Sequence, residues 1–137
     1  MHSQVSLVGA PTDIGASTRG ASMGPEALRV AGLQQTLEAQ GVEVVDRGNL
    51  GGPGNPCLPP VNGYRHLAEV TAWNRLVHDA VHGELTSGRL PILLGGDHSL
   101  AIGSIAAVGR HCRDTGKRLR VLWLDAHADF NTSVLTP

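Results

Sequence analysis

The sequence predicts an α/β fold in which a parallel sheet carries helices on both faces. Apolar runs alternate with helical segments from Val5 to Leu124, the order expected when strands are joined by helical crossovers. Two runs, Pro91–Leu94 (PILL) and Val121–Leu124 (VLWL), are continuously apolar rather than alternating. Such runs are typical of parallel strands that are covered on both faces. The pattern therefore indicates a three-layer α/β/α arrangement.

The first half of the chain predicts two strands and one helix. Val5–Val8 is an apolar run that ends in Gly-Ala-Pro, as a strand does where it meets a loop. Pro25 is suited to a first helical turn and a glycine follows residue 40, so we expect a helix over 25–40. Val42–Asp46 (VEVVD) predicts the second strand, and the Gly- and Pro-rich segment 48–63 predicts a long loop.

The second half predicts a long helix from Tyr64 to about Leu85 and another over 99–113. The long helix has apolar residues repeating at three and four: Leu67, Val70, Trp73, Val77, Ala80 and Val81. His78 and His82 lie four apart on it, a spacing that can bind a metal. No glutamate follows the first of them as in a zincin motif, so we interpret both as solvated histidines on the helix face.

Composition excludes several kinds of partner. The chain has 137 residues, a net charge of −1 and no basic run, which argues against nucleic acid and anionic membrane. No apolar stretch approaches the roughly 18 residues of a transmembrane helix, and no secretory signal is visible at the N-terminus. Cys57 and Cys112 do not make a disulfide framework. We expect two free thiols and a cytoplasmic location.

Residues that commonly bind metals follow two of the predicted strands. Asp97 and His98 come after PILL, and the segment Asp125-Ala-His127-Ala-Asp129 comes after VLWL. The carboxyl ends of strands are where open α/β sheets place their sites. Carboxylates and imidazoles without a thiolate favour a harder divalent ion such as Mn²⁺ over a structural zinc. Each motif alone has a simpler explanation, a polar strand end or a helix cap, but the two together indicate a metal site.

These residues resemble two signature motifs of the ureohydrolases, the family of arginases and agmatinases. The motifs are GGDHS (Gly95–Ser99) and DAHAD (Asp125–Asp129), and the segment from Gly9 to Leu33 is similar to the family's first loop and helix. The resemblance covers essentially the whole chain. It implies an arginase-like fold and hydrolysis of a guanidinium group to urea at a pair of Mn²⁺ ions.

The resemblance also implies roles for particular residues. His98, Asp125 and Asp129 would bind one ion, Asp125 would bridge to the second, and His127 would bind that second ion. Asp97 would support the ligands rather than bind the metal, as groups that orient metal-binding histidines do. Asn131 in DAHADFNT is similar to the arginase residue that holds the α-carboxylate of L-arginine, although a turn residue is the simpler interpretation. Two ions can lower the pKa of a shared water and direct it at the guanidinium carbon.

The chain lacks other parts of the family pattern. A later motif with the last two metal-binding aspartates is missing, as are the catalytic histidine and a late glutamate, so catalytic residues are expected beyond residue 137. We expect residues 1–137 to be the N-terminal part of a single arginase-like domain. Family strands that lie between PILL and VLWL would then be missing, leaving sheet edges and apolar faces exposed.

The sequence therefore predicts a manganese-dependent arginase that makes L-ornithine and urea, with this chain an incomplete and inactive part of it. The family resemblance implies a homo-oligomer. Three alternatives stay open. The first is an agmatinase or another ureohydrolase acting on a related guanidino substrate. The second is a one-zinc deacetylase, which GGDHS and Asp129 disfavour. The third is an inactive fragment that serves only as an association module.

Overall fold

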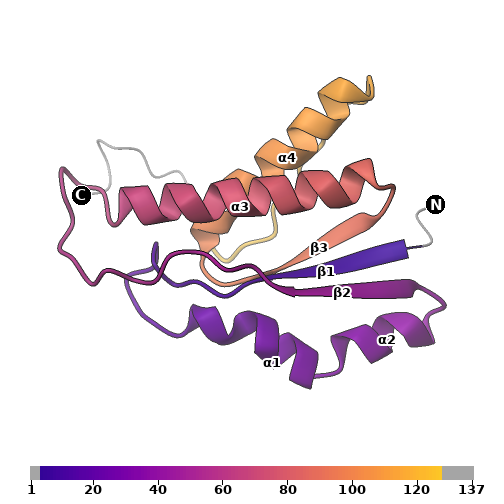
Figure 1. The fold of residues 1–137 in the computed structure, drawn as a ribbon, viewed down its shortest axis with the longest axis horizontal. Coiled ribbons are helices and arrows are strands. Elements are labelled where there is room, and N and C mark those ends of the chain that lie inside the picture. Colours follow the sequence, from indigo (N-terminus) through magenta and orange to yellow (C-terminus); the bar gives the residue numbers. More distant parts are fainter. Residues whose placement is uncertain (1–3, 128–137) are drawn as a thin grey trace.

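A computed structural model describes residues 4–127 and contains a parallel sheet of three strands in this part of the chain. The strands are β1 (Gln4–Ala10), β2 (Glu43–Asn49) and β3 (Leu90–Gly95). Their order is β2-β1-β3, with β1 in the centre and parallel to both neighbours (Figure 1). Leu7 pairs with Asp46 on one side and with Ile92 on the other. The predicted strands at the start and middle of the chain are confirmed.

Helices cover both faces of this sheet, which confirms the predicted fold class. On one face lie α1 (Gly24–Val30) and α2 (Leu33–Ala39). On the other lie α3 (Leu67–Thr86) and α4 (Ala101–Asp114), as Figure 1 shows. Short 3₁₀ turns precede α1 and α4, at Ala21–Met23 and His98–Leu100. Both crossovers from strand to strand are therefore helical, as a parallel sheet requires.

Two apolar clusters hold the layers together. On the α3/α4 side the buried residues are Ala10, Ile14, Trp73, Val77, Val81, Leu100 and Ala107. On the α1/α2 side Val5, Leu7 and Leu94 are buried, with Leu33 and Leu37 of α2 packed against them. Because Leu7 and Val8 point to opposite faces of β1 and both are fully buried, the central strand is covered on each side.

The predicted single helix over 25–40 is wrong, because the chain breaks at Gly32 into α1 and α2. Gly32 has a φ of 82°, a left-handed conformation that glycine adopts without steric cost. Its N–H donates to Arg29 O and its own carbonyl accepts from Thr36 N, so it ends one helix and starts the next. The sequence offers the same glycine signal at position 41, where φ is 80°, and that stop is confirmed.

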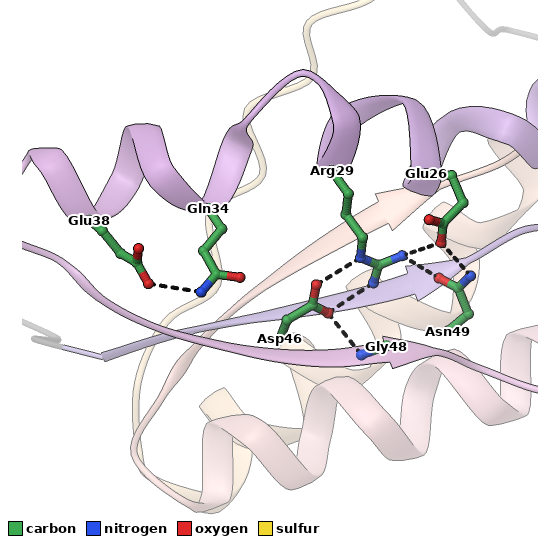
Figure 2. A network of polar contacts seen from close by, with 7 residues as sticks. All are labelled: Glu26, Arg29, Gln34, Glu38, Asp46, Gly48 and Asn49. Carbon is green, nitrogen blue, oxygen red and sulfur yellow. Dashed lines mark hydrogen bonds and ion pairs between the residues drawn. The ribbon is translucent and has the colours of Figure 1, made fainter.

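An ion-pair network fastens α1 to β2 (Figure 2). Arg29 donates from Nε and Nη2 to both oxygens of Asp46, at 2.7 and 2.9 Å. Its Nη1 donates to Glu26 at 2.8 Å and to Asn49 at 2.6 Å. The guanidinium and the N–H of Gly48 hold the pKa of Asp46 below its usual value, against the opposing effect of burial. A planar guanidinium that binds a carboxylate through two atoms fixes direction as well as distance.

The predicted fourth strand, Val121–Leu124, is wrong in this structure. These residues have no strand conformation and are exposed, with Leu122 at 84% and Leu124 at 87%. In residues 4–127, β3 is the last strand of the sheet: one of its edges pairs with β1 and the other pairs with no described strand. Residues 121–124 therefore have no strand partner there. The strand at PILL is confirmed, but only Leu94 in it is buried, as expected for an edge strand.

Both predicted helices of the second half are present with shifted starts. The long helix begins at Leu67 rather than Tyr64, because His66 adopts a left-handed conformation with φ 46°. The His66 ring holds the preceding loop, with Nδ1 3.0 Å from Ile14 O and Nε2 2.9 Å from Leu58 O. The second helix is a 3₁₀ turn from His98 that continues as α4.

The histidines of α3 are less solvated than predicted. The side chains of His78 and His82 are 23% and 20% exposed, and their rings stack in parallel with centroids 5.9 Å apart. His82 Nε2 lies 3.5 Å from Asp114 Oδ2 of α4. Stacked parallel rings do not converge on one point, so this pair is not arranged as a chelate.

Cys57 and Cys112 are free thiols, as predicted. Among residues 4–127 no helix combines the length and the apolar character needed to cross a membrane.

Candidate metal centre

The candidate site lies where β1 and β3 end side by side. Ala10 and Gly95 are register partners at the carboxyl ends of these strands. After Ala10 the chain enters the segment Pro11–Gly20, here called the first loop, and after Gly95 it enters the turn that carries His98. Both segments therefore leave the sheet at the same edge, as expected for a parallel α/β site.

Close packing of backbone on backbone holds these two segments together. Gly96 N–H donates to Ala10 O at 3.2 Å and Asp97 N–H donates to Thr12 O at 2.9 Å. A Cβ placed on Gly96 would lie 1.9 Å from Thr12 O, so only glycine fits there. The second glycine of GGDHS is therefore explained by the approach of the first loop rather than by an unusual φ.

Asp97 begins the turn that carries His98 and is a buried residue, 9% exposed. Oδ1 accepts the Ser99 N–H at 2.9 Å and the Ser99 hydroxyl at 2.6 Å, which caps the 3₁₀ turn. Oδ2 accepts the Gly15 N–H of the first loop at 2.8 Å. The prediction that Asp97 supports the site rather than binds metal stays a prediction, but both its oxygens are committed to other donors.

His98 and Asp125 are brought together although 27 positions separate their numbers. His98 Nδ1 lies 3.4 Å from Asp125 Oδ2, and the side chains are 52% and 24% exposed. The Trp123 ring lies against His98 with centroids 4.9 Å apart and planes tilted by 54°. His98 and Trp123, with Asp97 and Leu124, line an open pocket of about 440 Å³. The sequence predicts both motifs at one site after two strands; the structure brings His98 and Asp125 into contact, although Asp125 follows no strand in the described residues.

His127 joins Asp125 through a local turn. Its backbone N–H donates to Asp125 Oδ1 at 2.8 Å and its Nδ1 lies 3.3 Å from the same oxygen. This backbone hydrogen bond is the main cause that lowers the pKa of Asp125, with smaller contributions from the His127 side chain and from the charge of His98. Burial opposes the shift. Asp125 is therefore a carboxylate at neutral pH, the form that binds a cation.

The remaining predicted residues, Asp129 and Asn131, lie outside the described residues. Among residues 4–127 no three potential ligands are arranged around a common point for a metal ion. In this part His98 and His127 instead each contact Asp125. The chemistry of these groups nevertheless fits a divalent ion, because two imidazoles beside an ionised carboxylate are the donors that Mn²⁺ accepts.

Two features of the site are not predicted by the sequence. The bond between Gly15 and Asp97 spans 82 positions, and no spacing pattern signals it. Trp123 is predicted only as a buried strand residue, yet it is 43% exposed and packs on His98. The sequence hints at the first feature only through the glycine at position 15. The structure explains that glycine, because a Cβ there would lie 3.1 Å from Asp97 Oδ1.

The structure thus defines an α/β protein with a cluster of carboxylate and imidazole groups at the carboxyl edge of a parallel sheet. The model of the arginase family matches residues 3–137, so the chain belongs to that family. This confirms the resemblance of the two motifs and of the first loop.

Relatives of known name agree with this assignment. An arginase of Brevibacillus brevis is 39% identical over 137 residues, which is 100% of this chain and 45% of the relative. The solved arginase of Bacillus caldovelox superposes with a TM-score of 0.87 at 38% identity, covering 97% of this chain and 44% of that one. An Entamoeba histolytica arginase solved in complex with L-ornithine gives a TM-score of 0.85 at 32% identity, covering 98% and 45%.

A hypothetical agmatinase from Burkholderia thailandensis also superposes, with a TM-score of 0.65 at 24% identity, covering 97% of this chain and 41% of that one. That likeness concerns the fold alone. In every one of these comparisons the chain spans less than half of the relative's length.

Proposed function

We propose that the full-length protein is a manganese-dependent arginase that hydrolyses L-arginine to L-ornithine and urea. The observation that carries the proposal is the contact between His98 of GGDHS and Asp125, the first residue of DAHAD, whose Nδ1 and Oδ2 atoms lie 3.4 Å apart. Arginase family membership and relatives named arginase support the reaction class. Residues 1–137 would be the N-terminal part of the single domain that performs it.

The residues of this chain would hold the metal pair from one side. We propose His98, Asp125 and Asp129 as ligands of one ion, with Asp125 shared and His127 on the second ion. When bound, the ions supply Lewis acidity and a water of lowered pKa at neutral pH. The residues of this chain would fix the ligands. The backbone hydrogen bonds of Gly96 and Asp97 position the turn that carries His98, and the His127 N–H orients Asp125.

Substrate and assembly are proposed on narrower grounds. Asn131 would accept the α-carboxylate of L-arginine and so distinguish it from agmatine, which lacks that group. The catalytic histidine, the last two metal ligands and the residue that pairs with the guanidinium are expected beyond residue 137. We therefore propose that residues 1–137 alone are inactive. The full-length protein would form a homo-oligomer in the cytoplasm.

The test is metal content and urea release by the full-length protein. Urea should be released from L-arginine faster than from agmatine or guanidinobutyrate, and a preference for either of the latter would overturn the substrate. Asp125→Asn and Asp129→Ala should lose most of their bound Mn²⁺. Asp79→Asn is the matched control, since Asp79 is an 81% exposed carboxylate of α3 far from these motifs in sequence. Unchanged Mn²⁺ content in Asp129→Ala would remove Asp129 from the site.

A further inference from the structure

We propose that Asp97 is a positioning residue of this site, one that fixes His98 by tying its turn to the first loop. The inference rests on the proposed metal site and assigns Asp97 no contact with metal or substrate. Three donors from two segments, the first loop and the 3₁₀ turn, bind this single carboxylate, and the next residue in the chain is the proposed ligand.

The first step is the division of labour between the two oxygens. Oδ1 accepts both donors of Ser99, at 2.9 and 2.6 Å, and so shapes the 3₁₀ turn itself. Oδ2 accepts the Gly15 N–H at 2.8 Å and so fixes where that turn lies relative to the first loop. Hydrogen bonds to a carboxylate are shorter and stronger than those between neutral groups, which makes this a stiff link.

The second step is that the first loop and the His98 turn are closely packed against each other at Gly15. A Cβ on Gly15 would lie 3.0 Å from Ser99 Oγ and 3.1 Å from Asp97 Oδ1, tighter than an ordinary contact. The first loop is itself braced, because the buried Asp13 carboxylate accepts the Gly20 N–H at 2.9 Å and the Ser22 hydroxyl at 3.1 Å. The turn is thus held against a rigid neighbour.

The third step concerns His98, whose side chain is half-exposed. The Trp123 ring touches it and Asp125 faces it, but both belong to a segment without strand pairing in the described part of the chain. On the side of Asp97, by contrast, the hydrogen bonds to Gly15, Thr12 and Ser99 fix the backbone that leads into His98. Groups that orient metal ligands in this way typically change metal affinity about 10- to 100-fold when removed.

Asp97→Asn in the full-length protein separates the two oxygens. Its remaining carbonyl oxygen can still cap Ser99, but the amide NH₂ then faces the Gly15 N–H, donor against donor. We expect Mn²⁺ affinity, measured by titration of the metal-free protein at a temperature where it is folded, to fall about 10- to 100-fold. Pulsed electron paramagnetic resonance should show the ¹⁴N coupling of His98 to bound Mn²⁺ weakened.

Two further variants complete the test. Ser99→Ala keeps the Gly15 link and should stay within about twofold of the wild-type affinity, since the Ser99 backbone N–H still caps the turn. Gly15→Ala keeps the N–H but pushes the loop off the carboxylate, and should weaken Mn²⁺ binding by an intermediate factor. It also serves if Asp97→Asn does not fold.

The outcomes are distinct. Wild-type affinity in folded Asp97→Asn, or in Gly15→Ala if the first does not fold, overturns the proposal and leaves the arginase assignment standing. A wild-type protein that binds Mn²⁺ but releases no urea from arginine overturns the assignment and leaves this test valid. A wild-type protein that binds no Mn²⁺ overturns both.

Discussion

Gly96→Ala should be the most damaging small substitution at the candidate site. The added Cβ would lie 1.9 Å from Thr12 O and 2.7 Å from Thr12 N, both of them backbone atoms that cannot rotate away. The contact is about 1.5 Å short of ordinary van der Waals distance, so the first loop and the His98 turn must separate. That separation breaks the bond from Asp97 N–H to Thr12 O, 2.9 Å long.

The expected cost follows from these two effects. Overpacking of a well-packed region costs about 1–3 kcal/mol, and the loss of a buried backbone hydrogen bond adds about 0.5–1.5 kcal/mol. We therefore expect the free energy of unfolding of the full-length protein to fall by about 1.5–4.5 kcal/mol. Urea denaturation followed by circular dichroism measures it, with Mn²⁺ present in neither sample so that metal binding does not enter.

Gly95→Ala is the matched control at the neighbouring position. Its Cβ would meet only Leu100 Cδ1, at 3.9 Å, and neither glycine has a positive φ. The control should be neutral or slightly more stable, because alanine restricts the unfolded chain. If the free energies of unfolding of Gly96→Ala and Gly95→Ala differ by less than about 0.5 kcal/mol, the close approach of Thr12 does not hold the site as described.

Two further predictions concern the parts of the fold that support the site. Asp46→Asn should cost about 1–2 kcal/mol near neutral pH, since the pair with Arg29 is charge-assisted and three-quarters shielded from solvent. Because folding lowers the pKa of Asp46, this stability is present above pH 3.8 and is lost as pH falls further, so the unfolding curves of variant and wild type should converge in acid. A stability difference that stays constant down to low pH would show that the loss does not come from the charged pair with Arg29. Leu7 is fully buried in β1, so Leu7→Ala should lower the free energy of unfolding by about 2–5 kcal/mol in urea denaturation. Leu58 is 62% exposed, so the control Leu58→Ala should lower it by less than about 0.5 kcal/mol. Equal losses would place Leu7 outside the core.

The sequence predicts most of the sheet and helices because their signals are local. The strands at Val5–Val8 and Pro91–Leu94 follow from apolar runs, and the long α3 follows from its three-and-four repeat. The break at Gly32 is missed because an isolated glycine within a helical pattern is often tolerated. There the competing interaction is tertiary: the α1 residue Arg29 is held to β2 by Asp46, while α2 packs on Val5 and Leu7.

The error at Val121–Leu124 has a different cause. An apolar run predicts that a segment will be buried, but a strand also needs a partner, and no pattern within a run names its partner. The sheet in the described residues ends at β3, so these four residues form no strand there.

For a related reason, the sequence predicts the side chains of the candidate site but not the contacts that hold them in place. Motifs identify side chains by their chemistry, and the rule that sites lie at the carboxyl ends of parallel strands places His98, which follows β3. Asp125 follows no strand in the described residues, yet it contacts His98. What holds them in place does not follow from that rule. The hydrogen bond from Gly15 to Asp97 spans 82 positions in the sequence. Its acceptor is the carboxylate of Asp97, the residue before the proposed ligand His98. In GGDHS the histidine carries the proposed chemistry, and the sequence already predicts a supporting role for Asp97. The structure adds the contacts on which that role would depend: the approach of Gly96 to Thr12 and the hydrogen bond from Gly15 to Asp97.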